Sequence, residues 1–157
     1  MLEKDKLYIS FHRPKTILGL LITLRTLGKY SHCELVYNDY VYLSNLGGIR
    51  IKPFIYKDNM DIYELDSHIE IPIVLEEFKR LKGKGYDYWA IFLAQLLELG
   101  IEHKDKYFCS ELCLHLINKG LDDSLTYNLM ALKESAFSPV KLFKYLKFME
   151  LLGKEVK

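Results

Sequence analysis

Cys109 stands at a position in this sequence that suits a chemical role. It follows a charged connector at 104–106 and lies at the start of a predicted helix over 108–118. The first turn of a helix exposes unpaired N–H groups at the positive end of the helix dipole, and both lower the pKa of a thiol. The same N–H groups can hold an oxyanion that forms beside the sulfur. The position favours a nucleophilic cysteine, and the alternative is a small core residue, as expected for Cys113 one turn later.

A cysteine nucleophile needs a base, and His32 is the histidine whose surroundings best suit that role. It begins a predicted strand over 31–37. On a strand, His32 and Glu34 point to one side, while Cys33 points to the other and is expected to face away from the site. A carboxylate beside a histidine fixes its tautomer and stabilises its protonated form. The alternative is a half-exposed strand histidine beside a solvated glutamate. The five histidines of the chain are His12, His32, His68, His103 and His115.

The number and spacing of the cysteines argue against a disulfide framework and against a metal site. Three cysteines are too few and odd in number for a framework, and they suit a reducing compartment. Cys109 and Cys113 share one face of a predicted helix, but His115 lies well round from them. Because no second Cys/His pair has the spacing of a zinc site, we expect no metal ion and no other cofactor.

The predicted elements that must position these residues form an α+β domain. Asn38-Asp39 is a turn signal between two strands, so that the middle of the chain reads as an antiparallel meander. The meander is followed by helices, which predicts an antiparallel sheet packed against helices. The predicted strands cover 6–11, 31–37, 40–44, 49–54 and 60–65, and the predicted helices cover 17–27, 74–81, 86–99, 108–118 and 140–152.

The composition indicates one globular domain over residues 1–157. Half of the residues are apolar and 27% are charged, which excludes a disordered chain. A net charge of +1 gives no reason to expect nucleic acid or an anionic membrane as a partner. The apolar run 17–24 is shorter than the about 20 residues of a transmembrane span, and we expect it to form a buried or groove-lining helix. No secretion signal is present at the start, and a cytosolic protein is the expectation.

Four short motifs occur in order along the chain: KYSHCELV (29–36), GGIR (47–50), GYDY (85–88) and YFCSEL (107–112). Together they resemble motifs of the circularly permuted NlpC-type papain-like superfamily. Residues 29–36 (KYSHCELV) resemble the histidine strand of that family, and residues 107–112 (YFCSEL) resemble its cysteine helix. Residues 47–50 (GGIR) and 85–88 (GYDY) resemble two elements between them. The resemblance extends from about residue 6 to residue 120. Members of this family include YiiX-like proteins, lecithin retinol acyltransferase and its relatives, and many phage and viral proteins.

The resemblance implies a permuted papain-like fold with Cys109 as nucleophile and His32 as its base. The family usually places a third polar group about a dozen residues after the histidine, which falls at Ser44 or Asn45. Either residue can orient an imidazole, but neither can balance its positive charge. Glu34 on the histidine strand is the alternative orienting group.

The implied chemistry is attack of Cys109 on an amide, ester or thioester carbonyl to form an acyl-enzyme. The backbone N–H of Cys109 would hold the oxyanion, with Tyr30 or Tyr86 as a further hydroxyl donor. The implied substrates are peptides, isopeptides or acyl lipids, and the resemblance also fits a protein encoded by a phage or a virus. The alternative is a catalytically inactive papain-like binding or virion module, which the uncharged residues Ser44 and Asn45 favour.

Overall fold

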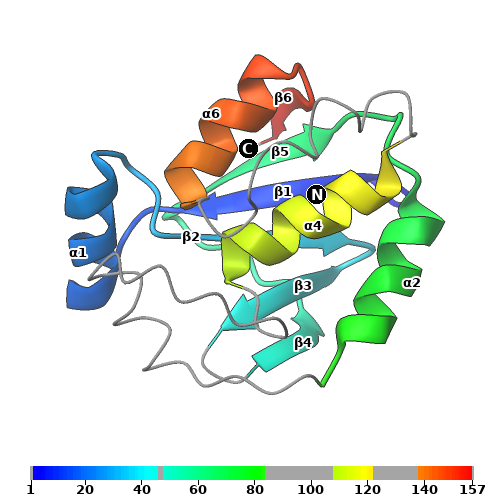
Figure 1. Ribbon diagram of the computed structural model, residues 1–157, viewed down its shortest axis with the longest axis horizontal. Helices are drawn as coiled ribbons and strands as arrows, with labels where there is room; N and C mark the ends of the chain where they lie inside the picture. The colour runs from blue at the N-terminus through cyan, green and yellow to red at the C-terminus, as the bar shows by residue number, and fades with distance from the viewer. Residues whose placement is uncertain (1, 46–47, 84–107, 122–137, 157) are drawn as a thin grey trace.

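The fold is an α+β domain with an antiparallel sheet, as the sequence predicts, and the sheet has six strands. The structure is a computed structural model that describes residues 2–45, 48–83, 108–121 and 138–156 (Figure 1). The predicted helix over 86–99 lies outside the described residues. The elements of the described residues are β1 (Leu7–His12), α1 (Ile17–Thr26), β2 (His32–Tyr37), β3 (Tyr40–Asn45), β4 (Gly48–Pro53), β5 (Met60–Leu65), α2 (Ile71–Leu81), α4 (Cys109–Gly120), α6 (Pro139–Phe148) and β6 (Leu152–Val156).

The strands lie in the order β4-β3-β2-β1-β5-β6, and each neighbouring pair is antiparallel. The tight turn between β2 and β3 has positive φ angles at Asn38 (45°) and Asp39 (64°), which these residue types tolerate. The expected meander includes the predicted strand 60–65, which is wrong, because this strand, β5, pairs with β1 and not with β4. Every residue of β1 is buried, so the backbone groups along both of its edges need partners, which β2 and β5 supply.

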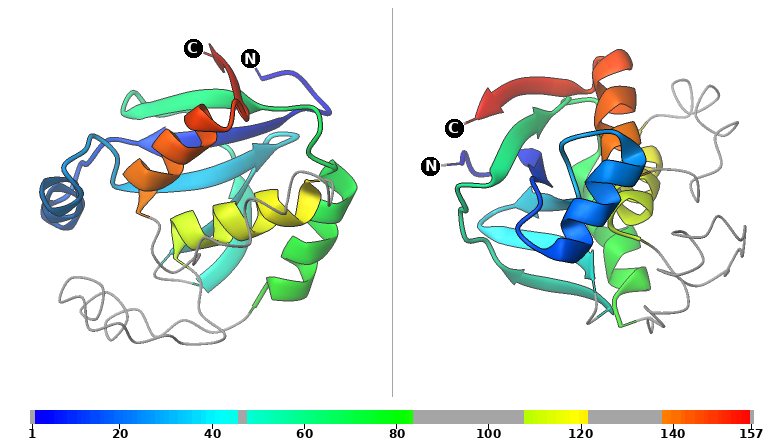
Figure 2. Two further views of the ribbon diagram at one scale, coloured as in Figure 1. Left: turned by 45° about the horizontal axis from the view of Figure 1, so that its top comes forward. Right: turned by 90° about the vertical axis from the view of Figure 1, so that its left-hand side faces the viewer.

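Among the described residues, three helices cover one face of the sheet. Figure 2 shows α2, α4 and α6 on the same side, and α4 crosses the central strands. Because side chains alternate along a strand, the odd-numbered residues of β1 and β2 face these helices. They pack with α4 in the main core, which includes Ile9, Phe11, Cys33, Leu35, Leu112 and Leu116. The even-numbered residues face the opposite side, where a smaller cluster contains Tyr8, Val36, Val41, Leu43, Met60 and Ile62.

The C-terminal segment differs from the sequence prediction. The helix expected over 140–152 ends at Phe148, and β6 follows as an edge strand beside β5. Glu150 has a left-handed φ of 58°, which breaks the helix between the two elements. Periodicity predicted the helix correctly, but it could not show that the free edge of β5 recruits the last residues.

Helix α1 exposes its aliphatic side chains, so of the two alternatives predicted for it, a buried or a groove-lining helix, the buried one is wrong. Ile17, Leu20 and Leu24 are 82%, 51% and 63% exposed, whereas the inward residues are the small or polar Gly19 and Thr23. The helix connects the end of β1 to the start of β2 and lies at one side of the molecule (Figure 1). Within the described ranges, no helix combines the length and the hydropathy that crossing a membrane requires.

Candidate active site

Helix α4 places Cys109 at its first residue, as the sequence predicts. The side chain of Glu111 caps this end, since its Oε2 accepts a hydrogen bond of 2.9 Å from the backbone N–H of Phe108. The backbone N–H groups of the first turn have no partner inside the helix, and they lie at its positive end. Because α4 packs against β2 and β3, its first turn is held close to the sheet. Cys109 is half-buried, whereas Cys113 lies in the core.

His32 is the first residue of β2 and interacts with both Cys109 and Glu34. Burial by itself would lower the pKa of this imidazole. The charge of Cys109, its hydrogen bond to His32 and the hydrogen bond of Glu34 outweigh burial and raise the pKa of His32 to about 10. The side chain is 28% exposed, so it also remains open to a solvent molecule or a substrate. The structure therefore brings together Cys109, His32 and Glu34, three of the residues that sequence reasoning selected.

The pKa of the Cys109 thiol is shifted in the opposite direction, downward. A hydrogen bond from Cys33 lowers the pKa of Cys109, burial opposes this, and the charge and hydrogen bond of His32 lower the pKa further, to well below its usual value. A lowered thiol pKa beside a raised imidazole pKa favours transfer of the proton from sulfur to the ring. The arrangement can therefore hold a thiolate–imidazolium pair at neutral pH.

Glu34 lies almost completely inside the protein, between two histidines. Its Oε1 lies 3.1 Å from Nε2 of His12, and its Oε2 lies 3.5 Å from Nε2 of His32. Burial would raise the pKa of this carboxyl, but the hydrogen bonds of His12 and His32 outweigh burial and hold the pKa far below its usual range. Glu34 is consequently ionised, and its contact with His32 suits the orienting role.

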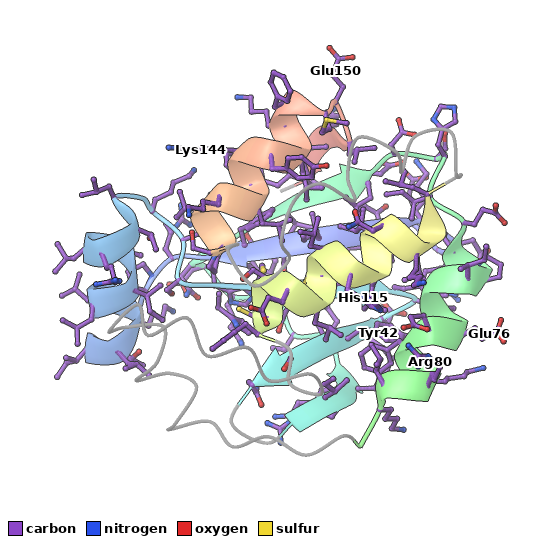
Figure 3. The ribbon with its side chains drawn as sticks, viewed as in Figure 1. Tyr42, Glu76, Arg80, His115, Lys144 and Glu150 are labelled. Atoms are coloured by element: carbon purple, nitrogen blue, oxygen red, sulfur yellow. The ribbon has the colours of Figure 1, made fainter. Side chains whose placement is uncertain are left out.

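Ser44 lies on the helix side of the sheet. Ser44 is buried near the end of β3 and faces the same way as Tyr42, which Figure 3 labels. The ring of Tyr42 packs against Phe78 of α2, with the two ring centroids 4.9 Å apart. The neighbouring candidate Asn45 accepts a hydrogen bond of 2.7 Å from Arg50. Glu34, by contrast, extends from the opposite face of the sheet by strand alternation.

The two tyrosines proposed as oxyanion donors have different outcomes. Tyr30 is buried in the main core, and its hydroxyl donates a hydrogen bond of 2.7 Å to Oδ2 of Asp61. A tyrosine hydroxyl has a single hydrogen to donate, so this bond directs Tyr30 to Asp61 and not to the site of Cys109. Tyr86 lies outside the described residues.

The prediction that Cys33 faces away from the site is wrong. Cys33 is fully buried on the helix side of β2, where it forms hydrogen bonds with Cys109 and Cys113. The alternation of side chains along β2 was predicted correctly, but α4 packs against the face that carries Cys33. His32 still reaches Cys109 because it lies at the very end of the strand.

Sequence reasoning also missed the contribution of His12. The β1–β2 register places His12 directly opposite His32, with the two ring centroids 5.3 Å apart. Ser10 and His12 are two residues apart and so lie on one face of β1, as His32 and Glu34 do on β2, and this spacing is visible in the sequence. The register that brings the two pairs together is set by the fold.

No family model and no curated protein matches this chain. Over the part of the chain that the structure describes, no group of histidine, cysteine, aspartate and glutamate residues has an arrangement that could hold a metal ion. The candidate site is thus characterised by its own geometry, which is that of a cysteine, a histidine and a buried carboxylate.

Proposed function

We propose that the protein is a cysteine hydrolase or acyltransferase with a permuted papain-like fold, in which Cys109 is the nucleophile and His32 is the base. The observation that carries this proposal is the contact of His32 with Cys109, at the first residue of α4, and with the buried carboxylate of Glu34, which together lower the pKa of Cys109 and raise the pKa of His32. Groups with pKa values displaced in this way by a specific charged partner are concentrated at catalytic sites. The order of the chain supports the permuted topology, since the histidine strand precedes the cysteine helix.

The chemistry begins with attack of the Cys109 thiolate on a carbonyl carbon of an amide, ester or thioester. A carbon–sulfur bond forms, and the carbonyl electrons move to the oxygen, which the backbone N–H of Cys109 stabilises. When the carbonyl reforms, the bond to the leaving group breaks, and the leaving group takes a proton from the His32 imidazolium. Water or another acceptor then attacks the thioester and gives a proton to His32, which releases the acyl group and restores the thiolate.

Glu34 supports this cycle by holding the imidazole in one orientation. An ionised carboxylate only accepts hydrogen bonds, so its contact with Nε2 of His32 requires a hydrogen on that nitrogen. Nδ1 is then the nitrogen that exchanges the proton with the thiol. Glu34 also balances the positive charge of the ring, which a serine at position 44 could not do.

The alternative of an inactive binding or virion module is less favoured by this site. Burying a carboxylate is costly unless it is paired, and here both oxygens of Glu34 contact histidines. The proposed substrates are peptides, isopeptides or acyl lipids. A reducing compartment such as the cytosol would keep the thiol of Cys109 active.

Alkylation by iodoacetamide tests the thiolate directly. Near neutral pH, mass spectrometry of peptides should show Cys109 modified much faster than Cys33 or Cys113, which are both buried. Equal and slow labelling of all three cysteines would contradict an activated thiolate.

Acyl transfer is tested by exposing the protein to a lipid ester, an isopeptide and a cell-wall peptide in parallel. The expected result is a thioester adduct on Cys109 with one of these donors, absent in Cys109→Ala. Cys113→Ala is the matched control, because it removes a thiol from the same helix and should retain the adduct. A reactive thiolate that forms no adduct with any donor would favour the binding module.

A further inference from the structure

The carboxylate of Glu34 contacts two histidines from neighbouring strands. Its Oε2 lies 3.5 Å from Nε2 of His32, and its Oε1 lies 3.1 Å from Nε2 of His12. The side chains of His12 and Glu34 are 8% and 7% exposed, so water does not readily replace either partner. The proposed mechanism uses His32 and Glu34, but it leaves the buried His12 without a role.

The chemistry of the two groups determines which is the donor and which is the acceptor in the contact between His12 and Glu34. An ionised carboxylate has no hydrogen to donate, so Nε2 of His12 must carry the hydrogen and donate it to Oε1 of Glu34. Ser10 then gives its own hydrogen to the backbone carbonyl of Glu34, at 3.4 Å, and its Oγ lies 3.3 Å from Nε2 of His12. This arrangement holds both the backbone and the side chain of Glu34.

The sheet itself brings His12 to this place. The register pairs His12 with His32 and Ser10 with Glu34, so these four side chains extend from one face of two adjacent strands. The rings of His12 and His32 meet edge to face at an interplanar angle of 66°. His12 therefore limits the movement of the carboxylate and also of the imidazole that it orients.

We infer that His12 is a positioning residue, which holds the Glu34 carboxylate so that its second oxygen orients His32 toward Cys109. This inference rests on the proposed function. Without the N–H of His12, Oε1 of Glu34 would be a buried acceptor with no hydrogen bond, which costs free energy. The carboxylate would lower this cost by rotating toward another donor and away from His32. His12 touches neither the thiol nor a substrate in this role, and it acts only through Glu34.

The test compares His12→Leu, which removes the donor, with His12→Gln, whose side-chain amide can donate from the position of Nε2. The measured quantity is the rate constant for alkylation of Cys109 by iodoacetamide near neutral pH, in the full chain. We expect the alkylation rate constant to fall about tenfold in His12→Leu, because the loss of a hydrogen bond to a charged group corresponds to about this factor. In His12→Gln the rate constant should stay close to that of the native protein.

The matched control is His115→Gln. His115 lies on α4, the helix that carries Cys109, on the side that faces α2 (Figure 3). Its Nε2 contacts Oε1 of Glu77 of α2 at 2.6 Å. We expect this variant to keep the native alkylation rate. An unchanged rate in His12→Leu, or an equal loss in the leucine and glutamine variants, would overturn the positioning role. If Cys109 of the native protein reacts no faster than Cys113, it is the proposed function that fails.

A second measurement on the native protein does not depend on any variant folding. Long-range ¹H–¹⁵N correlation spectra distinguish the two ring nitrogens of a histidine. A hydrogen on Nε2 of His12 is the expected result, whether or not Nδ1 also carries one. A ring with its hydrogen on Nδ1 alone could not donate to Glu34 through the observed contact and would overturn the inference.

Discussion

Replacement of Glu34 by glutamine is the most direct test of how the site holds its charges. Glu34→Gln keeps the size and shape of the side chain but removes the negative charge that lies 3.5 Å from Nε2 of His32. The pKa of His32 is raised to about 10 in the native protein, partly through this carboxylate. We expect the variant to lower the pKa of His32 and, because the two groups are coupled, to raise the pKa of Cys109.

The size of the shift follows from the strength of the contact. A hydrogen bond to a charged group contributes about 1.5 to 3 kcal/mol, and about 1.36 kcal/mol corresponds to one pKa unit. The pKa of His32 should therefore fall by about one to two units. Because the folded-state pKa is raised, protonated His32 stabilises the fold at low pH, and this contribution is lost as pH rises through about 10. In the variant, the loss should occur at correspondingly lower pH.

The assay is a titration of the His32 ring proton by NMR from about pH 5 to about pH 11, a range that includes ordinary and raised histidine pKa values. Glu77→Gln is the control, because Glu77 contacts a different histidine, His115, at 2.6 Å. It should leave the midpoint of His32 unchanged. A midpoint that is the same in Glu34→Gln as in the native protein would refute the assignment of Glu34 as the charge partner.

Three further predictions concern the surroundings of the site and the core. Cys33→Ala should raise the pKa of Cys109 and slow its alkylation near neutral pH by about three- to tenfold, because a hydrogen bond that favours the thiolate is lost; an unchanged rate would contradict this role. Gly120→Ala should lower the free energy of unfolding in urea by about 1 to 3 kcal/mol, because the added Cβ would come within 2.6 Å of Cγ2 of Val74, and unaltered stability would show that this contact relaxes easily. Leu24→Gln should change stability by less than about 0.5 kcal/mol in the same assay, since this side chain is 63% exposed, and a larger loss would mean that α1 is covered.

Local signals in the sequence determined the elements that carry the site. The start of a helix at Cys109 and the start of a strand at His32 follow from nearby residues and from periodicity, and the structure has both. Strand alternation also placed His32 and Glu34 on one side, where their contact is observed. These features depend on a few consecutive residues, which is why they can be predicted without the rest of the chain.

Tertiary structure decided which elements meet. Alternation shows that Cys33 and His32 point in opposite directions, but only the packing of α4 shows that the face of Cys33 is the one covered by helices. The place of β5 beside β1 puts Asp61 at the hydroxyl of Tyr30, which removes that hydroxyl from the site. Such contacts join residues far apart in the chain, so they depend on burial of the whole core and not on local propensity.

His12 illustrates the same division. Its residue type and its place at the end of a predicted strand can be read from the sequence. The sequence also shows that Ser10, two residues earlier, would lie on the same face of that strand. Only the antiparallel register of β1 with β2 places His12 opposite His32, with its Nε2 at 3.1 Å from Glu34. A shift of the register by one residue would turn the side chain to the other face. The sequence by itself therefore selected Cys109, His32 and Glu34 as candidates, whereas the pairing of the strands decided that a second histidine, His12, contacts Glu34 and the ring of His32.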